Sequence, residues 1–176
     1  MRPTLPSLAI AAVLCLPGIS AAQESATGDI VNAQGEKIGA VTLTDGPNGV
    51  MLAIGVADLP SGPHGLHIHA VGTCDDAAEG FKASGSHVNP SEAAHGLMNA
   101  DGPDAGDLPN LIVHEDGTAA VEMFSPLVAL TEADGRANLL DEDGSALVIH
   151  EGRDDQMSQP IGGAGARIAC AAIGGM

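Results

Sequence analysis

The sequence predicts an all-β domain in which eight short strands close into a barrel or a sandwich. Short apolar runs alternate with turn signals along most of the chain, which is the pattern of an antiparallel β protein. Gly and Pro supply 24 and 11 of the 176 residues, so turns and loops are expected to be numerous. An apolar fraction of 44% is nevertheless sufficient for a hydrophobic core within one domain.

Eight segments are expected to form the strands. In chain order they are residues 27–32, 38–44, 50–57, 65–69, 111–114, 119–124, 146–150 and 166–172. Asp-Gly-Pro-Asn-Gly at 45–49 and Glu-Asp-Gly at 115–117 are typical of hairpin turns. Almost no alternation is found from 71 to 109, and a shorter irregular stretch covers 151–165. A loop as long as the first of these is usually functional in a compact domain.

The charge balance of the chain argues against nucleic acid as a partner. Six basic residues against 23 acidic ones give a net charge of −17, so no basic face for phosphates is expected. Trp and Tyr are absent, and Phe81 and Phe124 supply the only Phe rings that could stack on a base. The composition therefore indicates an acidic, loop-rich domain that does not bind nucleic acid.

The first 22 residues differ in character from the rest of the chain. Arg2 provides a positive start, a short apolar run follows, and small residues precede a cleavage position before Gln23. The run is too short to span a bilayer comfortably, and a buried N-terminal helix is the alternative interpretation. We expect a secretory signal peptide at 1–22, no membrane anchor, and a domain at 23–176 that is periplasmic or otherwise exported.

Two cysteines, Cys74 and Cys170, remain after removal of this segment. An even pair in an oxidising compartment favours a single disulfide, and two buried free thiols are the alternative. Such a disulfide would fasten the C-terminal part of the chain to a loop in its first half.

The placement of the histidines suggests metal binding. His67 and His69 are separated by one residue in a strand-like run, so their imidazoles are expected to project from the same face. His87 and His95 lie in the long loop, and His150 ends a later strand. Imidazoles bind copper and zinc, and an all-nitrogen tetragonal set favours Cu(II).

Two carboxylates follow in the same long loop. Asp104 and Asp107 could complete a harder, tetrahedral site for zinc. Two other histidines are not expected to be ligands. On a regular strand His64 faces away from His67, and His114 stands beside acidic residues at a strand end, where a solvated side chain is expected.

Five motifs occur in order along the chain. They are Gly-Pro-His-Gly-Leu-His-Ile-His at 62–69, Ser-Gly-Ser-His-Val-Asn-Pro at 84–90, Gly-Asp-Leu-Pro at 106–109, Leu-Val-Ile-His at 147–150 and Gly-Ala-Gly-Ala-Arg-Ile-Ala-Cys at 163–170. Together they resemble the bacterial secreted copper/zinc superoxide dismutases over most of residues 27–174. The resemblance implies an eight-stranded Greek-key β-barrel, similar to an immunoglobulin-like sandwich, whose two long loops bind metal outside the barrel.

The resemblance also implies an enzyme with one copper and one zinc per subunit, which dismutates superoxide by alternating Cu(II)/Cu(I) chemistry. The implied roles are copper ligation by His67, His69, His87 and His150, zinc ligation by His87, His95 and Asp107, a bridging and proton-donating role for His87, attraction of superoxide by Arg167, an outer carboxylate at Asp154, and a disulfide between Cys74 and Cys170. Zinc, which has no redox chemistry, would be structural and electronic. Superoxide is the expected partner, and both homodimer and monomer remain open.

The chain departs from the family pattern at Asp104, where the family usually has a histidine. An aspartate Oδ and a histidine Nδ1 are both two bonds from Cβ, so Asp104 can reach the same point in space. We therefore expect zinc to be bound by His87, His95, Asp104 and Asp107. The alternative is that Asp104 points to solvent and that water or nothing fills the fourth position.

Two other functions remain open from the sequence. One is an exported copper-binding or copper-buffering protein on the same fold with little turnover. The other is a catalytically silent Greek-key module used for adhesion or structure. Loss of a copper histidine or of Arg167 would favour either, and the sequence has lost none of them.

Overall fold

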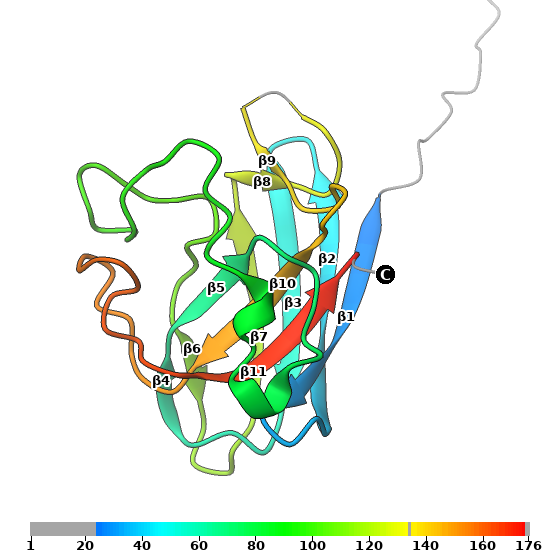
Figure 1. Ribbon diagram of the computed structural model, residues 1–176, viewed down its shortest axis with the longest axis vertical. Helices are drawn as coiled ribbons and strands as arrows, with labels where there is room; N and C mark the ends of the chain where they lie inside the picture. Colours follow the sequence, from blue (N-terminus) through cyan, green and yellow to red (C-terminus); the bar gives the residue numbers. More distant parts are fainter. Residues whose placement is uncertain (1–23, 134, 175–176) are drawn as a thin grey trace, which may run out of the picture.

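The computed structural model describes residues 24–133 and 135–174, which form a curled β-sheet structure with almost no helix (Figure 1). The strands are β1 (Ser25–Asn32), β2 (Lys37–Gly46), β3 (Gly49–Val56), β4 (Gly62–His64), β5 (Leu66–His69), β6 (Leu111–Val113), β7 (Ala119–Ser125), β8 (Val128–Ala129), β9 (Ala137–Asn138), β10 (Ser145–His150) and β11 (Arg167–Ile173). Two short 3₁₀ helices, η1 (Ala77–Glu79) and η2 (Lys82–Ser84), follow β5. The signal peptide predicted at 1–22 lies outside the described residues.

The all-β prediction is confirmed. Each predicted strand is present, as β1, β2, β3, β5, β6, β7, β10 and β11. The three additional strands, β4, β8 and β9, have only two or three residues each, so they carry no alternation that a sequence pattern could show. None of the helices in the described part of the chain is long and apolar enough to cross a membrane.

Seven strands form one sheet in the order β5-β10-β11-β1-β2-β3-β7. Strand β4 pairs with β6, and Gly65 alone separates β4 from β5. A tight turn joins β6 to β7, in which His114 N donates to Thr118 O at 2.8 Å. The sequence neighbours β3 and β4 are therefore separated in space by β7 and β6, which is a Greek-key connection.

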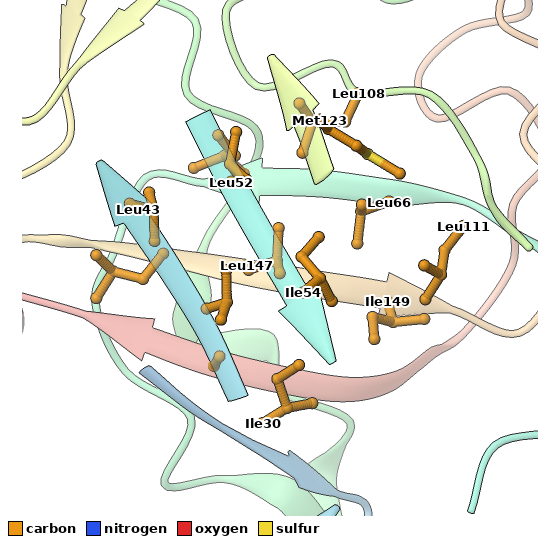
Figure 2. Close-up of a cluster of buried hydrophobic side chains, with 14 of the residues drawn as sticks. Ile30, Leu43, Leu52, Ile54, Leu66, Leu108, Leu111, Met123, Leu147 and Ile149 are labelled. Atoms are coloured by element: carbon orange, nitrogen blue, oxygen red, sulfur yellow. The ribbon is translucent and has the colours of Figure 1, made fainter. Parts of the chain in front are cut away.

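Side chains from the inner face of the curled sheet form the main core (Figure 2). Along β3, Val50, Leu52, Ile54 and Val56 are buried at alternate positions, as expected for a strand with one face on a core. Each side chain of this kind stabilises the fold by about 1.5–3 kcal/mol when it leaves water. The barrel is therefore held by apolar packing that is independent of the loops.

Strand β10 contributes to two separate clusters of buried side chains. Leu147 and Ile149 belong to the main core, whereas the residues on the opposite face pack outside it with Phe81 and Cys170. Cys170 forms a disulfide with Cys74, with the two Cα atoms 5.8 Å apart. The disulfide predicted from the cysteine count is thus present, and it holds the loop after β5 against β11.

The two long loops lie beside one another at one side of the barrel (green and orange in Figure 1). Hydrogen bonds connect them directly. Met98 N donates to Gln156 O at 3.1 Å, and His95 N donates to Gln159 Oε1 at 3.0 Å. The segments 71–109 and 151–165 therefore form one covering layer over the outer face of β5 and β10, where the site lies.

Candidate metal centre

Alternation along β5 places two histidines outside the barrel. Leu66 and Ile68 belong to the main core, so His67 and His69 project from the opposite face. Both histidines are nevertheless buried, because the long loops cover that face. The strand therefore presents two imidazoles to a space between barrel and loops.

His150 and His87 reach the same space from elsewhere in the chain. The register between β10 and β11 shifts between Ile149 and His150, and His150 then pairs with Arg167. The ring centroid of His67 lies 4.1 Å from that of His87 and 4.8 Å from that of His150. The structure thus brings together the four histidines that the sequence predicts for copper.

Hydrogen bonds determine which nitrogen of these rings carries a proton. His69 and His150 each donate from Nδ1 to a backbone carbonyl oxygen at 2.9 Å. His67 donates from Nε2 to Asp154 Oδ2, also at 2.9 Å. Since a carbonyl or a carboxylate only accepts, the other nitrogen of each ring keeps its lone pair.

Four ring nitrogens are buried without a hydrogen-bond partner among the residues that the structure describes. They are His67 Nδ1, His69 Nε2, His87 Nε2 and His150 Nε2. A buried polar atom without a partner is destabilising, and such atoms are rare in folded proteins. The ligand atoms of His67, His69 and His150 lie within 4.8 Å of one another. Converging imidazole lone pairs of this kind fit a copper ion.

A second group of ligand atoms surrounds the other nitrogen of His87. His87 Nδ1 lies 2.9 Å from Asp104 Oδ2 and 3.6 Å from Asp107 Oδ1. His95 Nδ1 lies 2.5 Å from Asp107 Oδ1. These four side chains are buried, so Asp104 does not point to solvent. The ligand atoms of His87, His95 and Asp107 lie within 4.8 Å of one another, and imidazoles and carboxylates are ligand types that fit a zinc ion.

Asp104 joins this second group through the ring of His87. By distance, the ligand atoms of His67, His87, His95 and Asp107 form a group within 4.8 Å, and Asp104 is not part of that group. Its Oδ1 accepts a hydrogen bond from Gly106 N at 3.0 Å, and its backbone N donates to Asp107 Oδ2 at 3.0 Å. The turn that contains both aspartates therefore directs the remaining oxygen, Oδ2, toward His87.

Asp154 connects the two groups of ligand atoms, because it forms a hydrogen bond with one histidine ring of each. Its Oδ2 accepts from His67 Nε2 at 2.9 Å, and its Oδ1 accepts from His95 Nε2 at 3.1 Å. Gln156 donates to the same carboxylate from its backbone N and its side-chain amide, at 2.6 and 2.9 Å. Burial by itself would raise the pKa of Asp154, but the bonds from His67, Gln156 and His95 outweigh it and lower the pKa to about 2. A permanent carboxylate in this position fixes the tautomer of both rings.

The loop over Asp154 requires a glycine at one position. Gly162 has a φ of +59°, and a Cβ there would collide with the Asp154 carboxylate. Any other residue would therefore displace either the loop or the carboxylate on which His67 and His95 depend.

Burial and charge give the rings different protonation states in the metal-free protein. Burial lowers the pKa of His69 to about 2 and that of His150 to about 4, and the positive charge of Arg167 adds to both effects. Burial would also lower the pKa of His87, but its hydrogen bonds with two carboxylates, that of Asp104 first, outweigh it and raise the pKa to about 9. His69 and His150 are therefore neutral rings, whereas the carboxylates of Asp104 and Asp107 stabilise the positive charge of His87.

Arg167 supplies a fixed positive charge beside these rings. A cavity of about 470 Å³ is lined by His69, His87, His150 and Arg167, among others. The guanidinium donates from Nη1 to Phe81 O at 2.6 Å and from Nη2 to a second backbone carbonyl at 2.7 Å. A planar, permanently charged donor held in this way can attract a small anion into the cavity.

Some contributors to the site carry no signal in the sequence. The side-chain amide of Gln159 accepts from His95 N at 3.0 Å and donates to His95 O at 2.9 Å, so it holds His95 by both backbone groups. A glutamine in an irregular loop has no periodicity that could reveal such a role. His64 is buried with its ring nitrogens 2.7 and 2.8 Å from two backbone carbonyl oxygens, which agrees with the expectation that it is not a metal ligand.

Fold and site together define a class of protein: a Greek-key β structure that holds metal ions between its outer face and two long loops. The family described as copper/zinc superoxide dismutase matches residues 37–173. The superoxide dismutase [Cu-Zn] of Caulobacter vibrioides is 47% identical over 150 residues, which cover 85% of each chain. That of Escherichia coli K12 is 36% identical over 181 residues, covering 95% of this chain and 97% of that protein.

A solved structure has the same fold as this chain. The crystal structure of a superoxide dismutase-like protein from Bacillus subtilis superposes with a TM-score of 0.78 at 37% identity, over 83% of this chain and 96% of that chain. The chain belongs to the copper/zinc superoxide dismutase family. Its activity is the dismutation of superoxide, with copper and zinc as cofactors, and the comparisons do not favour a copper-buffering protein with little turnover.

Proposed function

We propose that copper is bound by His67, His69, His87 and His150, and that zinc is bound by His87, His95, Asp104 and Asp107. The observation that carries the copper assignment is the set of four buried imidazole nitrogens without a hydrogen-bond partner within the described part of the chain. When bound, copper supplies the one-electron couple between Cu(II) and Cu(I), and zinc supplies charge without redox chemistry. The overall reaction converts two superoxide anions and two protons into O₂ and hydrogen peroxide.

Arg167 is proposed to bind the superoxide anion. Its guanidinium is anchored by two carbonyl oxygens and lines the same cavity as His69 and His150. Because the whole chain has a net charge of −17, this local positive charge is needed to make the cavity attractive to an anion.

His87 is proposed to hold one of the two protons at Nε2, which faces the other copper ligands. Its Nδ1 is directed toward Asp104 and Asp107, and the negative charge of these carboxylates stabilises the ring when it is protonated. The proton can then be passed to the reduced oxygen species in the cavity.

The protein is proposed to act outside the cytoplasm. The signal-like pattern at residues 1–22 and the disulfide between Cys74 and Cys170 both support export, to the periplasm or beyond, without a membrane anchor. Mass spectrometry of the exported protein is expected to give an N-terminus at Gln23 and no lipid. Sedimentation of that material distinguishes a homodimer from a monomer.

Metal analysis and a superoxide-consumption assay on the same preparations test the assignment. The wild type is expected to contain one copper and one zinc per chain. His69→Ala removes a ligand without disturbing the core, so it is expected to lose copper and activity. The unfolding temperature of its metal-free form at neutral pH is expected to stay near that of the metal-free wild type. His114→Ala, a change at an exposed histidine, is the matched control and is expected to keep both. A His69→Ala protein that retains copper and most of its activity would refute the ligand set.

A further inference from the structure

Ser84 is a fully buried polar residue at the end of η2, directly before the loop segment that leads to His87. A buried hydroxyl is destabilising unless its hydrogen-bonding capacity is used. Its surroundings therefore show what the hydroxyl does.

Three polar groups surround the Ser84 hydroxyl. Ser84 Oγ lies 2.8 Å from Phe81 O, 3.2 Å from His69 Nδ1 and 3.2 Å from Arg167 Nη1. A hydroxyl has one proton to donate and two lone pairs to accept with. The three contacts use this capacity completely.

The direction of each bond follows from the partners. Phe81 O can only accept, so the Ser84 hydroxyl donates its proton there. The guanidinium of Arg167 can only donate. His69 Nδ1 also lies 2.9 Å from Gly85 O, which can only accept, so Nδ1 carries the proton of that ring. Ser84 Oγ therefore accepts from both His69 and Arg167, and it cannot rotate without losing a bond.

One hydroxyl thus touches both a proposed copper ligand and the proposed anion-binding side chain. Through His69 it supports the tautomer that leaves Nε2 free for the metal. Through Arg167 it adds a third contact to a guanidinium that is otherwise held by the carbonyl oxygens of Phe81 and Gly85. The orientation of the guanidinium relative to the copper ligands therefore depends on this side chain.

We propose that Ser84 is a positioning residue that couples the orientation of Arg167 to that of His69 and thereby sets the affinity of the cavity for small anions. The inference rests on the proposed copper site. If the hydroxyl only completed the turn at Phe81, its removal would lower stability and leave the affinity for anions unchanged.

The test measures azide binding to the copper- and zinc-loaded protein by optical titration, because azide is a monovalent anion that ligates Cu(II). Ser84→Ala is expected to weaken azide binding about 2- to 10-fold, the range for one lost hydrogen bond. It is also expected to alter the EPR spectrum of Cu(II), because His69 loses a hydrogen bond. Alanine fits the turn, since Ser84 is not among the residues with positive φ.

The matched control is Ser145→Ala. Ser145 is 1% exposed, and its hydroxyl has no hydrogen-bond partner among the residues described in the structure. It lies at the opposite end of β10 from His150, next to the register partner Ile173. The same chemical change at this buried position is expected to leave both azide affinity and the EPR spectrum as in the wild type. Unfolding temperatures of both variants report any general loss of structure.

A double-mutant cycle with Arg167→Ala separates the two contacts. In the Arg167→Ala background, Ser84→Ala is expected to have no further effect on azide binding and still to change the EPR spectrum. The proposal is overturned if Ser84→Ala binds azide like the wild type, if its effect persists without Arg167, or if the EPR spectrum never changes. A wild-type protein that fails to bind copper would instead refute the proposed metal site.

Discussion

Asp104 provides the sharpest test of the zinc site, because this position departs from the family pattern. Its Oδ2 lies 2.9 Å from His87 Nδ1, and its Oδ1 is held by Gly106 N at 3.0 Å. Asp104→Asn keeps the shape of the side chain and removes its negative charge, whereas Asp104→Ala removes the ligand atom. Both changes are expected to leave the barrel core intact, since Asp104 does not belong to the hydrophobic core and its hydrogen bonds are to His87, Gly106 and Asp107.

The expected magnitude distinguishes a ligand from a supporting residue. If Asp104 only oriented His87 by a hydrogen bond, its loss would weaken zinc binding about 10- to 100-fold. As one of four ligands it is expected to cost more than about 100-fold, or about 2.7 kcal/mol. Asp104→Asn is expected to fall between the wild type and Asp104→Ala, because an amide oxygen remains but its charge does not.

The assay is competition for zinc with a chelator of known affinity, followed at several pH values. Ligands must be deprotonated to bind metal, and an aspartate is deprotonated in mild acid where a free histidine is not. Wild-type protein is therefore expected to retain zinc to lower pH than Asp104→His. Equal zinc affinities for the wild type and Asp104→Ala would show that Asp104 is not a ligand and would refute this reasoning.

Two further predictions concern charge and protonation. Arg167→Glu is expected to lower the second-order rate of superoxide consumption more than tenfold, because charges farther away than about 8 Å are already screened at physiological ionic strength and the local charge at residue 167 decides the attraction of the anion. Added salt should slow the wild type and partly restore the variant. Equal rates and salt dependences for the two proteins, measured by stopped flow, would remove Arg167 from the mechanism. In the metal-free protein, burial holds the pKa of His69 at about 2 and that of His150 at about 4, below the ordinary 6.5. The unfolded chain then binds more protons than the folded one below pH 6.5, so the free energy of unfolding should fall from pH 6.5 to 4 by about 1.4 kcal/mol per pH unit for each ring. The unfolding temperature of the metal-free protein should fall with it, and His69→Ala should reduce this dependence on pH. An unfolding temperature of the wild type that does not change over this range would contradict the prediction.

Much of the fold could be predicted because its signals are local. The alternation of β3 and the turn at 45–49 depend on neighbouring residues only, and both are present in the structure. The strands β8 and β9 could not be predicted, because a pairing of two residues depends on where the rest of the chain holds them. The same division applies to the site.

The sequence by itself determined which kinds of ligand are available and in what order. The spacing of two residues between His67 and His69 on one strand already places both imidazoles on one face, since side chains alternate along a strand. The even pair of cysteines similarly favours a disulfide, because thiols of an exported chain meet an oxidising compartment. These conclusions need only residue identity and short spacing.

The tertiary structure alone decided how the distant groups meet. The antiparallel register of β10 with β5 aligns the strand that ends at His150 with the strand that carries His67 and His69. The register shift between Ile149 and His150 then pairs His150 with Arg167 of β11. The direction of Asp104 and the three contacts of Ser84 follow from hydrogen bonds between segments that are far apart in sequence. Burial then shifts the protonation of each ring, because desolvation depends on everything packed around it rather than on the residue itself.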